Sequence, residues 1–242
     1  MLALRPLRSV PATVEPAVRA LAAGEPVLVF DAPDREGETD LFFLSETATP
    51  ELVRLARKDA GGLICTAISD ELKRRLDLPY FAELLTLARP EHPTVAQLAE
   101  SPRYDRRSAF GITVNHRANY TGVPDNDRAL TIRTVGEIAR KAPELSDAEL
   151  RAEFQDAFVS PGHVQLLYSA PGLFAERKGH TELAISLARM AGVSESVTVC
   201  EMLGDSGGAR SPEAAARYAE AHGFPFLEGR TIIDAWRRWS SA

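Results

Sequence analysis

A cluster of charged residues directly follows an apolar run at residues 27–30. The stretch Asp34-Arg35-Glu36-Gly37-Glu38-Thr39-Asp40 places four carboxylates and one guanidinium within seven residues. We expect a loop at a sheet edge, where open α/β folds bind ligands. Carboxylates this close repel one another unless a cation or a hydrogen-bonding ligand lies between them, and hard divalent ions prefer oxygen donors. The stretch indicates a site for a divalent metal and a polyhydroxy ligand, with a solvated acidic turn as the alternative.

A second charged segment, Arg177-Lys178-Gly179-His180-Thr181-Glu182, sets two cations and a glycine at a predicted helix N-terminus. Free backbone N–H groups and the positive end of the helix dipole bind anions there. The guanidinium and the ammonium add donors that suit phosphate. The segment therefore predicts a phosphate site, with a basic loop capped by Thr181 as the alternative. His180 could also bind a metal through its imidazole, provided that the fold brings it near Glu36.

Two residues elsewhere are candidates for proton transfer. His163 lies in Ser160-Pro161-Gly162-His163-Val164, which we expect to form a turn that aims the imidazole. Glu201 ends an apolar, strand-like run, where a carboxylate is costly unless it is paired or functional. Both side chains suit general acid–base catalysis. The alternatives are a turn histidine without a chemical role and a strand-end carboxylate that reaches water.

The segment from Thr121 to Arg128 combines a hydroxyl, a glycine, two acids and an arginine. We expect these residues to form one loop after a strand. Such a loop could cradle a phosphate or hold the Asp127 carboxylate over a substrate, although turn-forming residues are common in any loop. Thr121 and Asp127 are therefore further candidate site residues.

Helix and strand signals alternate along the chain and predict an α/β fold. Strands are expected at 26–30, 63–68, 110–116, 196–202 and 224–227, and helices are expected to begin near Thr13, Thr49, Ser69, Thr134, Ser146, Thr181 and Ser211. Residues 88–108 contain three prolines and no periodicity, which predicts an irregular surface excursion. Because no linker is evident, we expect a single domain over residues 1–242.

The composition excludes several classes of function. A net charge of −6 argues against the broad basic surface that non-specific nucleic-acid binding needs. Cys65 and Cys200 lie in apolar segments and are expected to be buried thiols, too few for a four-cysteine zinc site. No apolar run is long enough to span a membrane, and residues 1–10 lack the hydrophobic stretch of a secretory signal. We therefore expect a cytoplasmic protein.

Taken together and in order, five segments resemble 3,4-dihydroxy-2-butanone 4-phosphate synthase of riboflavin biosynthesis, over roughly residues 14–235. Each segment alone is weakly specific, whereas their joint order is specific. They are Asp34 to Asp40; Thr121-Gly122-Val123 with Asp127-Arg128; Pro161-Gly162-His163-Val164; Gly179-His180-Thr181-Glu182; and Cys200-Glu201 with Ala209-Arg210-Ser211-Pro212-Glu213.

The resemblance implies a magnesium-dependent lyase, with manganese as an alternative ion, that converts D-ribulose 5-phosphate to L-3,4-dihydroxy-2-butanone 4-phosphate and formate. It implies a compact single-domain α/β sandwich with a mixed sheet and flanking helices, and a homodimer with active sites at or near the subunit boundary. By position, Glu36 and His180 match the metal ligands, and His163, Glu201 and Asp127 match catalytic positions. The implied substrate contacts are Arg35, Glu36, Asp40, Thr121, Arg177, Lys178, Gly179, His180, Thr181 and Glu201.

The chain departs from the family pattern at several points. Pro124 stands where the family commonly has a serine, and Lys178 stands where it usually has a glycine. The 88–108 and 142–158 segments are longer than usual and could cover the site. A bifunctional relative carries a GTP cyclohydrolase II region, for which too little chain remains beyond Glu213, so we expect the monofunctional form.

Two other classes of function remain open from the sequence. One is another divalent-metal-dependent sugar-phosphate enzyme, an isomerase or aldolase that uses the same acids and phosphate segment. The other is a non-enzymatic nucleotide- or RNA-binding module, against which the acidic net charge speaks.

Overall fold

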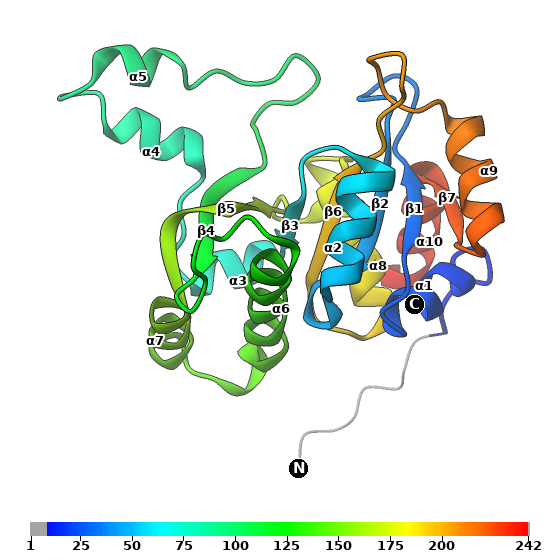
Figure 1. Ribbon diagram of the computed structural model, residues 1–242, viewed down its shortest axis with the longest axis horizontal. Coiled ribbons are helices and arrows are strands. Elements are labelled where there is room, and N and C mark those ends of the chain that lie inside the picture. The colour runs from blue at the N-terminus through cyan, green and yellow to red at the C-terminus, as the bar shows by residue number, and fades with distance from the viewer. Residues whose placement is uncertain (1–8, 242) are drawn as a thin grey trace.

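The computed structural model describes residues 9–241, so most of the stretch considered for a secretory signal lies outside it. Seven strands within these residues form one mixed sheet in the order β4-β5-β3-β6-β2-β1-β7 (Figure 1). The strands are β1 (Val27–Phe30), β2 (Thr39–Leu44), β3 (Cys65–Ile68), β4 (Phe110–His116), β5 (Phe158–Tyr168), β6 (Ser196–Glu201) and β7 (Phe226–Glu228).

Ten α-helices within the described residues surround this sheet. They are α1 (Glu15–Ala22), α2 (Pro50–Leu55), α3 (Asp70–Arg75), α4 (Phe81–Leu87), α5 (Pro93–Gln97), α6 (Asp125–Lys141), α7 (Asp147–Ala157), α8 (His180–Ala191), α9 (Pro212–His222) and α10 (Gly229–Ser241). A mixed sheet with flanking helices confirms the predicted α/β fold class. No helix in this part of the chain has both the length and the apolar character needed to cross a bilayer.

The central strands are buried on both faces because helices cover both sides of the sheet. Val29 packs in a core with residues of α1, α8 and α10, whereas its neighbour Leu28 packs with residues of α2, α6 and α9. A third core joins α3, α6 and α7 to β4 and β5. Figure 1 shows α2 and α6 on one face and α8 and α10 on the other. Because successive side chains of a strand point to opposite faces of the sheet, one strand contributes residues to the cores on both sides.

Several predicted helix starts are confirmed by their caps. The side chains of Thr49, Ser69 and Ser211 accept hydrogen bonds from the backbone N–H groups of Leu52, Leu72 and Ala214. Each of these hydroxyls satisfies a donor that lacks a partner within its helix. Ser146 caps α7 in the same way, and the Glu149 carboxylate accepts the Ser146 N–H in return.

The predicted start of a helix at Thr134 is wrong. Thr134 lies inside α6, which begins at Asp125, and its hydroxyl donates to the Leu130 carbonyl as helix-interior threonines do. Asp127 therefore lies in the first turn of a helix and not in the predicted loop. The acidic side chains there face the positive end of the helix dipole.

Two predicted caps at other helices are also wrong. The residue before α1 is Val14, which makes no side-chain cap, so Thr13 does not cap this helix. The residue before α8 is Gly179, so Thr181 lies within the first turn. The Glu182 carboxylate accepts the Gly179 N–H at 3.1 Å and takes over the capping role.

The predicted turn at residues 160–164 is instead part of β5. Its pairing with β4 shifts register there, and the Ser160–Pro161 peptide bond is cis. Gly162 lies so close to β4 that a Cβ atom would come within 2.0 Å of the Val114 carbonyl carbon. Proline and glycine therefore mark an irregular strand with a close backbone approach, not a chain reversal.

The 88–108 segment is less irregular than the sequence predicts, because it contains the short helix α5. Figure 1 shows α4 and α5 projecting away from the sheet, and neither helix has a buried residue in the described chain. Five of the strands and α-helices were not predicted from the sequence: β2, β5, α4, α5 and α10.

Candidate active site

The acidic stretch and the basic segment meet at one point of the fold, although 144 residues separate Glu36 from His180. Glu36 lies in the loop between β1 and β2, Asp40 lies in β2 and not in the predicted loop, and His180 is the first residue of α8. His180 Nδ1 lies 3.1 Å from Glu36 Oε2, and His180 Nε2 lies 3.5 Å from Asp40 Oδ1. The two sides of the imidazole ring thus face two carboxylates.

Asp31 gives the acidic loop its shape and was not among the predicted site residues. Its carboxylate accepts the backbone N–H groups of Glu36, Gly37 and Glu38 at 3.0, 3.0 and 3.1 Å. Ligand atoms of Asp31, Glu36 and His180 all lie within 4.8 Å of one another. These contacts span five to seven residues, farther than the local hydrogen bonds by which an aspartate marks a turn, so the sequence carried no signal for them.

The carboxylates of this cluster repel one another, which favours the binding of a cation between them. Burial opposes the ionisation of Glu36, but the hydrogen bond from His180 and the charge of Arg35 outweigh it and lower the pKa of Glu36 to about 2. Burial raises the pKa of Asp40, and Glu201, Glu36 and Glu38 raise it further although His180 opposes them. A divalent ion would relieve this repulsion between carboxylates.

Two guanidinium groups line the same site. Arg35 Nη1 lies 3.2 Å from Asp31 Oδ2 and 2.8 Å from Glu36 Oε2, and Arg177 Nη1 donates to Glu182 Oε2 at 2.7 Å. A Cβ on Gly179 would lie 2.3 Å from Arg177 Nη1 and 2.6 Å from Arg35 Nη2. Glycine at this position therefore allows both arginines to approach the start of α8.

A cavity of about 330 Å³ opens onto these groups. Glu201 lies in its wall at the end of β6, where the Leu63 N–H donates to Glu201 Oε2 at 2.8 Å. Gly62 also packs against the Glu201 side chain, since a Cβ there would lie 2.4 Å from Oε2. Seven predicted site residues line this cavity: Arg35, Glu36, Asp40, Arg177, His180, Thr181 and Glu201.

Three predicted residues form a separate group in this chain. Thr121, Asp127 and His163 are absent from the lining of the 330 Å³ cavity within the described residues. Asp127 Oδ2 accepts the Gly122 N–H at 2.8 Å and the Thr121 N–H at 3.3 Å. Asn115, which was not predicted, accepts the His163 N–H at 2.9 Å and has its Nδ2 atom 3.0 Å from His163 Nδ1.

Two predicted residues remain, Lys178 and Gly179. Neither is among the described residues that line this cavity. Lys178 is exposed, whereas Gly179 is buried between the arginines. The positive charge of Lys178 therefore lies on the surface beside the predicted phosphate segment.

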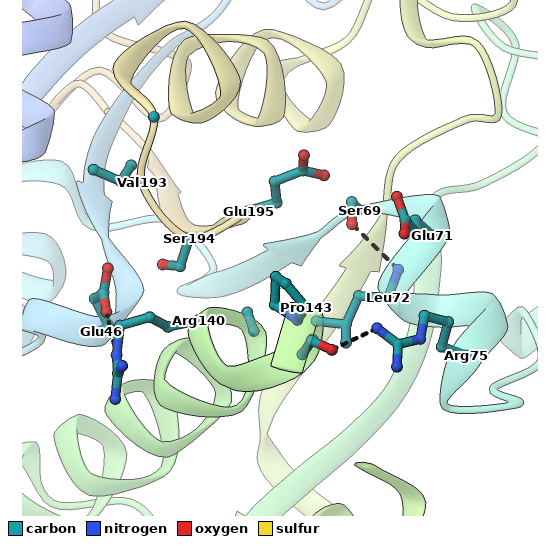
Figure 2. Close-up of a pocket in the computed structure, with 13 residues that line it drawn as sticks. Glu46, Ser69, Glu71, Leu72, Arg75, Arg140, Pro143, Val193, Ser194 and Glu195 are labelled. Atoms are coloured by element: carbon teal, nitrogen blue, oxygen red, sulfur yellow. Dashed lines mark hydrogen bonds and ion pairs between the residues drawn. The ribbon is translucent and has the colours of Figure 1, made fainter. Parts of the chain in front are cut away.

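A larger cavity of about 460 Å³ lies at the opposite ends of β2, β3 and β6 (Figure 2). Four of the five charged side chains in its described lining are already paired within the protein. Arg140 lies 3.2 Å from Glu46, Glu195 accepts two hydrogen bonds from Arg189, and Arg75 binds Asp147 and two carbonyl groups. Because its described lining includes no predicted site residue, we assign the candidate active site to the smaller cavity.

Comparisons with known proteins agree with the resemblance seen in the sequence. The family model of 3,4-dihydroxy-2-butanone 4-phosphate synthase matches residues 15–235. A protein of that name from Methanosarcina mazei is 44% identical over 228 residues, which cover 93% of this chain and 91% of the relative. The crystal structure of the Candida albicans synthase is 27% identical, with a TM-score of 0.69 over 93% of this chain and 98% of that chain.

A further solved synthase, described as a complex with two magnesium ions, has the same fold. Its TM-score is 0.72 at 24% identity, and the match covers 91% of this chain and 94% of that chain.

Proposed function

The chain belongs to the 3,4-dihydroxy-2-butanone 4-phosphate synthase family, and on that premise we propose that its acid–histidine cavity converts D-ribulose 5-phosphate to L-3,4-dihydroxy-2-butanone 4-phosphate and formate. The reaction is a step of riboflavin biosynthesis. The observation that carries the proposal is the 3.1 Å approach of Glu36 to His180 in a cavity that also contains Arg35 and Arg177. Carboxylates that can bind a cation and guanidinium groups that can bind a phosphate thus face the same small cavity.

Glu36 and His180 would hold a magnesium ion in this cavity, with manganese as an alternative ion. Two buried atoms support the fit, because Asp40 Oδ1 and His180 Nε2 have no hydrogen-bond partner among the described residues. When bound, a divalent ion acts as a Lewis acid on the sugar oxygens and stabilises an enediolate. The relative described with two magnesium ions supports the choice of metal.

Arg35 and Arg177 would hold the phosphate of the substrate, with Lys178 adding positive charge at the rim. The start of α8, at Gly179, His180 and Thr181, adds the positive end of a 12-residue helix. Guanidinium groups bind phosphate oxygens through paired N–H donors. Holding the phosphate at one end of the cavity keeps the reacting carbons in register with Glu201 and the metal ligands.

Glu201 would transfer protons at the sugar carbons. The Leu63 N–H holds one of its oxygens at 2.8 Å, which fixes the carboxylate at the cavity wall. A positioned carboxylate and an imidazole can exchange protons with the substrate during enolisation, dehydration and rearrangement, before formate leaves. His163 would supply the imidazole.

A second copy of the chain would bring His163, together with Thr121 and Asp127, to the cavity. Apolar side chains beside this group support a homodimer, since Tyr120 is 99% exposed and Val123 and Val159 are also exposed. Exposed apolar side chains that gather at one place mark surfaces that another chain can cover. In such a dimer each active site contains residues of both subunits.

We also propose that residues 1–242 form a single synthase-like domain in the cytoplasm. The family match spans most of the chain, and both cysteines are buried and unpaired, as is usual in a reducing compartment.

The test of the proposed function is the release of formate from D-ribulose 5-phosphate. Formate should form only when magnesium or manganese is present, and EDTA should abolish it. A phosphorylated product with an unchanged number of carbons would instead identify a sugar-phosphate isomerase.

A further inference from the structure

Asp105 forms the closest link between the two arginines of the site. Its Oδ2 atom accepts a hydrogen bond from Arg35 Nη2 at 2.7 Å and another from Arg177 Nε at 2.8 Å. The Asp105 side chain is only 10% exposed. One carboxylate oxygen thus occupies the space between two cations that, in the proposed function, bind the substrate phosphate.

The other acidic partners of these arginines belong to the same parts of the fold as Glu36 and His180. Asp31 and Glu36 lie in or beside the loop after β1, and Glu182 lies in the first turn of α8. Asp105, in contrast, comes from the 88–108 segment, about 70 residues from either arginine in sequence. Asp105 can therefore leave the two arginines without a movement of the loop after β1 or of α8.

The segment that carries Asp105 covers the cavity and packs weakly against the rest of the protein. Pro102, Tyr104 and Ser108 line the cavity, and the Tyr104 ring lies 5.2 Å from the Arg35 guanidinium carbon. Earlier in the segment, Leu98 is 70% exposed, and α5 has no buried residue in the described chain. The ion pairs of Asp105 are therefore a main attachment of this cover.

We propose that Asp105 occupies the position of the substrate phosphate in the unliganded enzyme, so that substrate binding displaces Asp105 and loosens residues 98–108 from the cavity. The inference rests on the proposed function, because it assumes that Arg35 and Arg177 bind the phosphate. A phosphate dianion and the Asp105 carboxylate would accept hydrogen bonds from the same N–H donors. Side by side in this partly buried site, their like charges would repel strongly. Asp105 therefore lowers the affinity of the site for phosphate.

The first test compares the binding of inorganic phosphate by calorimetry, in full-length protein with magnesium present. Asp105→Asn keeps the shape of the side chain but removes its charge, and it should bind phosphate roughly three- to tenfold more tightly than the wild type. The Michaelis constant for D-ribulose 5-phosphate should fall by a similar factor. Glu100→Gln, which removes a charge from an exposed position of the same segment, should bind phosphate as the wild type does.

Equal or weaker phosphate binding by Asp105→Asn would overturn the inference, because it would mean that Asp105 only positions the arginines. Arg177→Gln separates this outcome from a failure of the proposed function. This variant should lose phosphate affinity, and wild-type affinity would show that the phosphate binds elsewhere, which would overturn both proposals.

The second test follows cleavage of the segment by trypsin at Arg103, Arg106 and Arg107. Saturating phosphate should speed the cleavage of the wild-type protein, whereas Asp105→Asn should be cleaved quickly with or without phosphate. A wild-type cleavage rate that phosphate leaves unchanged or slows would contradict the displacement of Asp105.

Discussion

His180 Nε2 lies 3.5 Å from Asp40 Oδ1, and among residues 9–241 neither atom has a hydrogen-bond partner. Both side chains are buried, with exposed residue fractions of 5% and 2%. A buried polar atom without a partner costs on the order of 1–3 kcal/mol. The protein therefore keeps two costly atoms at the cavity, on the side of the imidazole ring that faces Asp40, where a bound ion would offset this cost.

Removal of either proposed ligand should weaken magnesium binding. Glu36→Gln keeps the volume of the side chain but removes its charge, and His180→Asn removes the imidazole. Each variant should bind magnesium at least about tenfold more weakly in calorimetry, because a hard cation loses a charged or directed donor. Glu25→Gln, at an exposed position in the turn before β1, is the matched control for net charge. Wild-type affinity in both ligand variants would exclude this pair as the metal site.

Acid should destabilise the metal-free protein partly through Glu36. The pKa of Glu36 is about 2 in the folded protein against an ordinary value of 4.5, so the unfolded chain takes up the proton first as the pH falls. The contribution of Glu36 to the free energy of unfolding, on the order of 2 kcal/mol, is present above about pH 5 and is lost as the pH falls toward 2.

Urea unfolding in EDTA, measured between about pH 2 and 6, checks this dependence. The free energy of unfolding of Glu36→Gln should change less with pH than that of the wild type. Parallel curves for the two proteins would show that Glu36 does not carry this part of the pH dependence.

Gly179→Ala should weaken substrate binding more than it changes stability. The new methyl group would meet the flexible ends of Arg177 and Arg35 at 2.3 and 2.6 Å, so the side chains can move while the backbone stays in place. Because those ends would bind the phosphate, the Michaelis constant should rise several-fold, with a change in unfolding free energy below about 1 kcal/mol. Gly208→Ala, where no atom lies within 4 Å of the new methyl group, should leave kinetics unchanged. Equal kinetics for the two variants would argue against a phosphate at α8.

The parts of the fold that could be predicted from sequence are those specified by local chemistry. Thr49, Ser69 and Ser211 each satisfy a backbone donor within three residues, so their helix starts are visible in sequence. In contrast, the 160–164 stretch has the composition of a turn but lies in β5, where its residues donate hydrogen bonds to Thr113 and Asn115 of the distant strand β4. Tertiary pairing therefore overrides the local preference of proline and glycine there.

The same distinction applies to the site. Residue types and order along the chain identify Glu36 and His180, whereas the contribution of Asp31 depends on three backbone N–H groups that only a folded loop brings to it. Asp105 could not be predicted, because nothing near it in sequence indicates a contact with Arg35 and Arg177. Its role depends on the path of the 88–108 segment across the cavity.

Single substitutions of the proposed proton-transfer groups should abolish formate release. His163→Ala should do so with little change in melting temperature, because His163 is exposed and its bonds go to one side chain, that of Asn115. Glu201→Ala should also lower stability slightly, since the Leu63 N–H loses its acceptor. Turnover close to that of the wild type in either variant would remove that residue from the catalytic set.

Mixing the two inactive variants tests whether His163 and Glu201 of one active site come from different subunits. In a mixed dimer of His163→Ala and Glu201→Ala, one site receives both intact residues and the other site receives neither. Random exchange of subunits in a twofold-symmetric dimer makes half of the dimers mixed, so activity should return to about one quarter of the wild-type value. Light scattering and affinity tags on each variant would verify that mixed dimers form. If they form but stay inactive, both residues must act within one chain, and the position of His163 outside the described cavity lining would require a movement of β5 to bring it there.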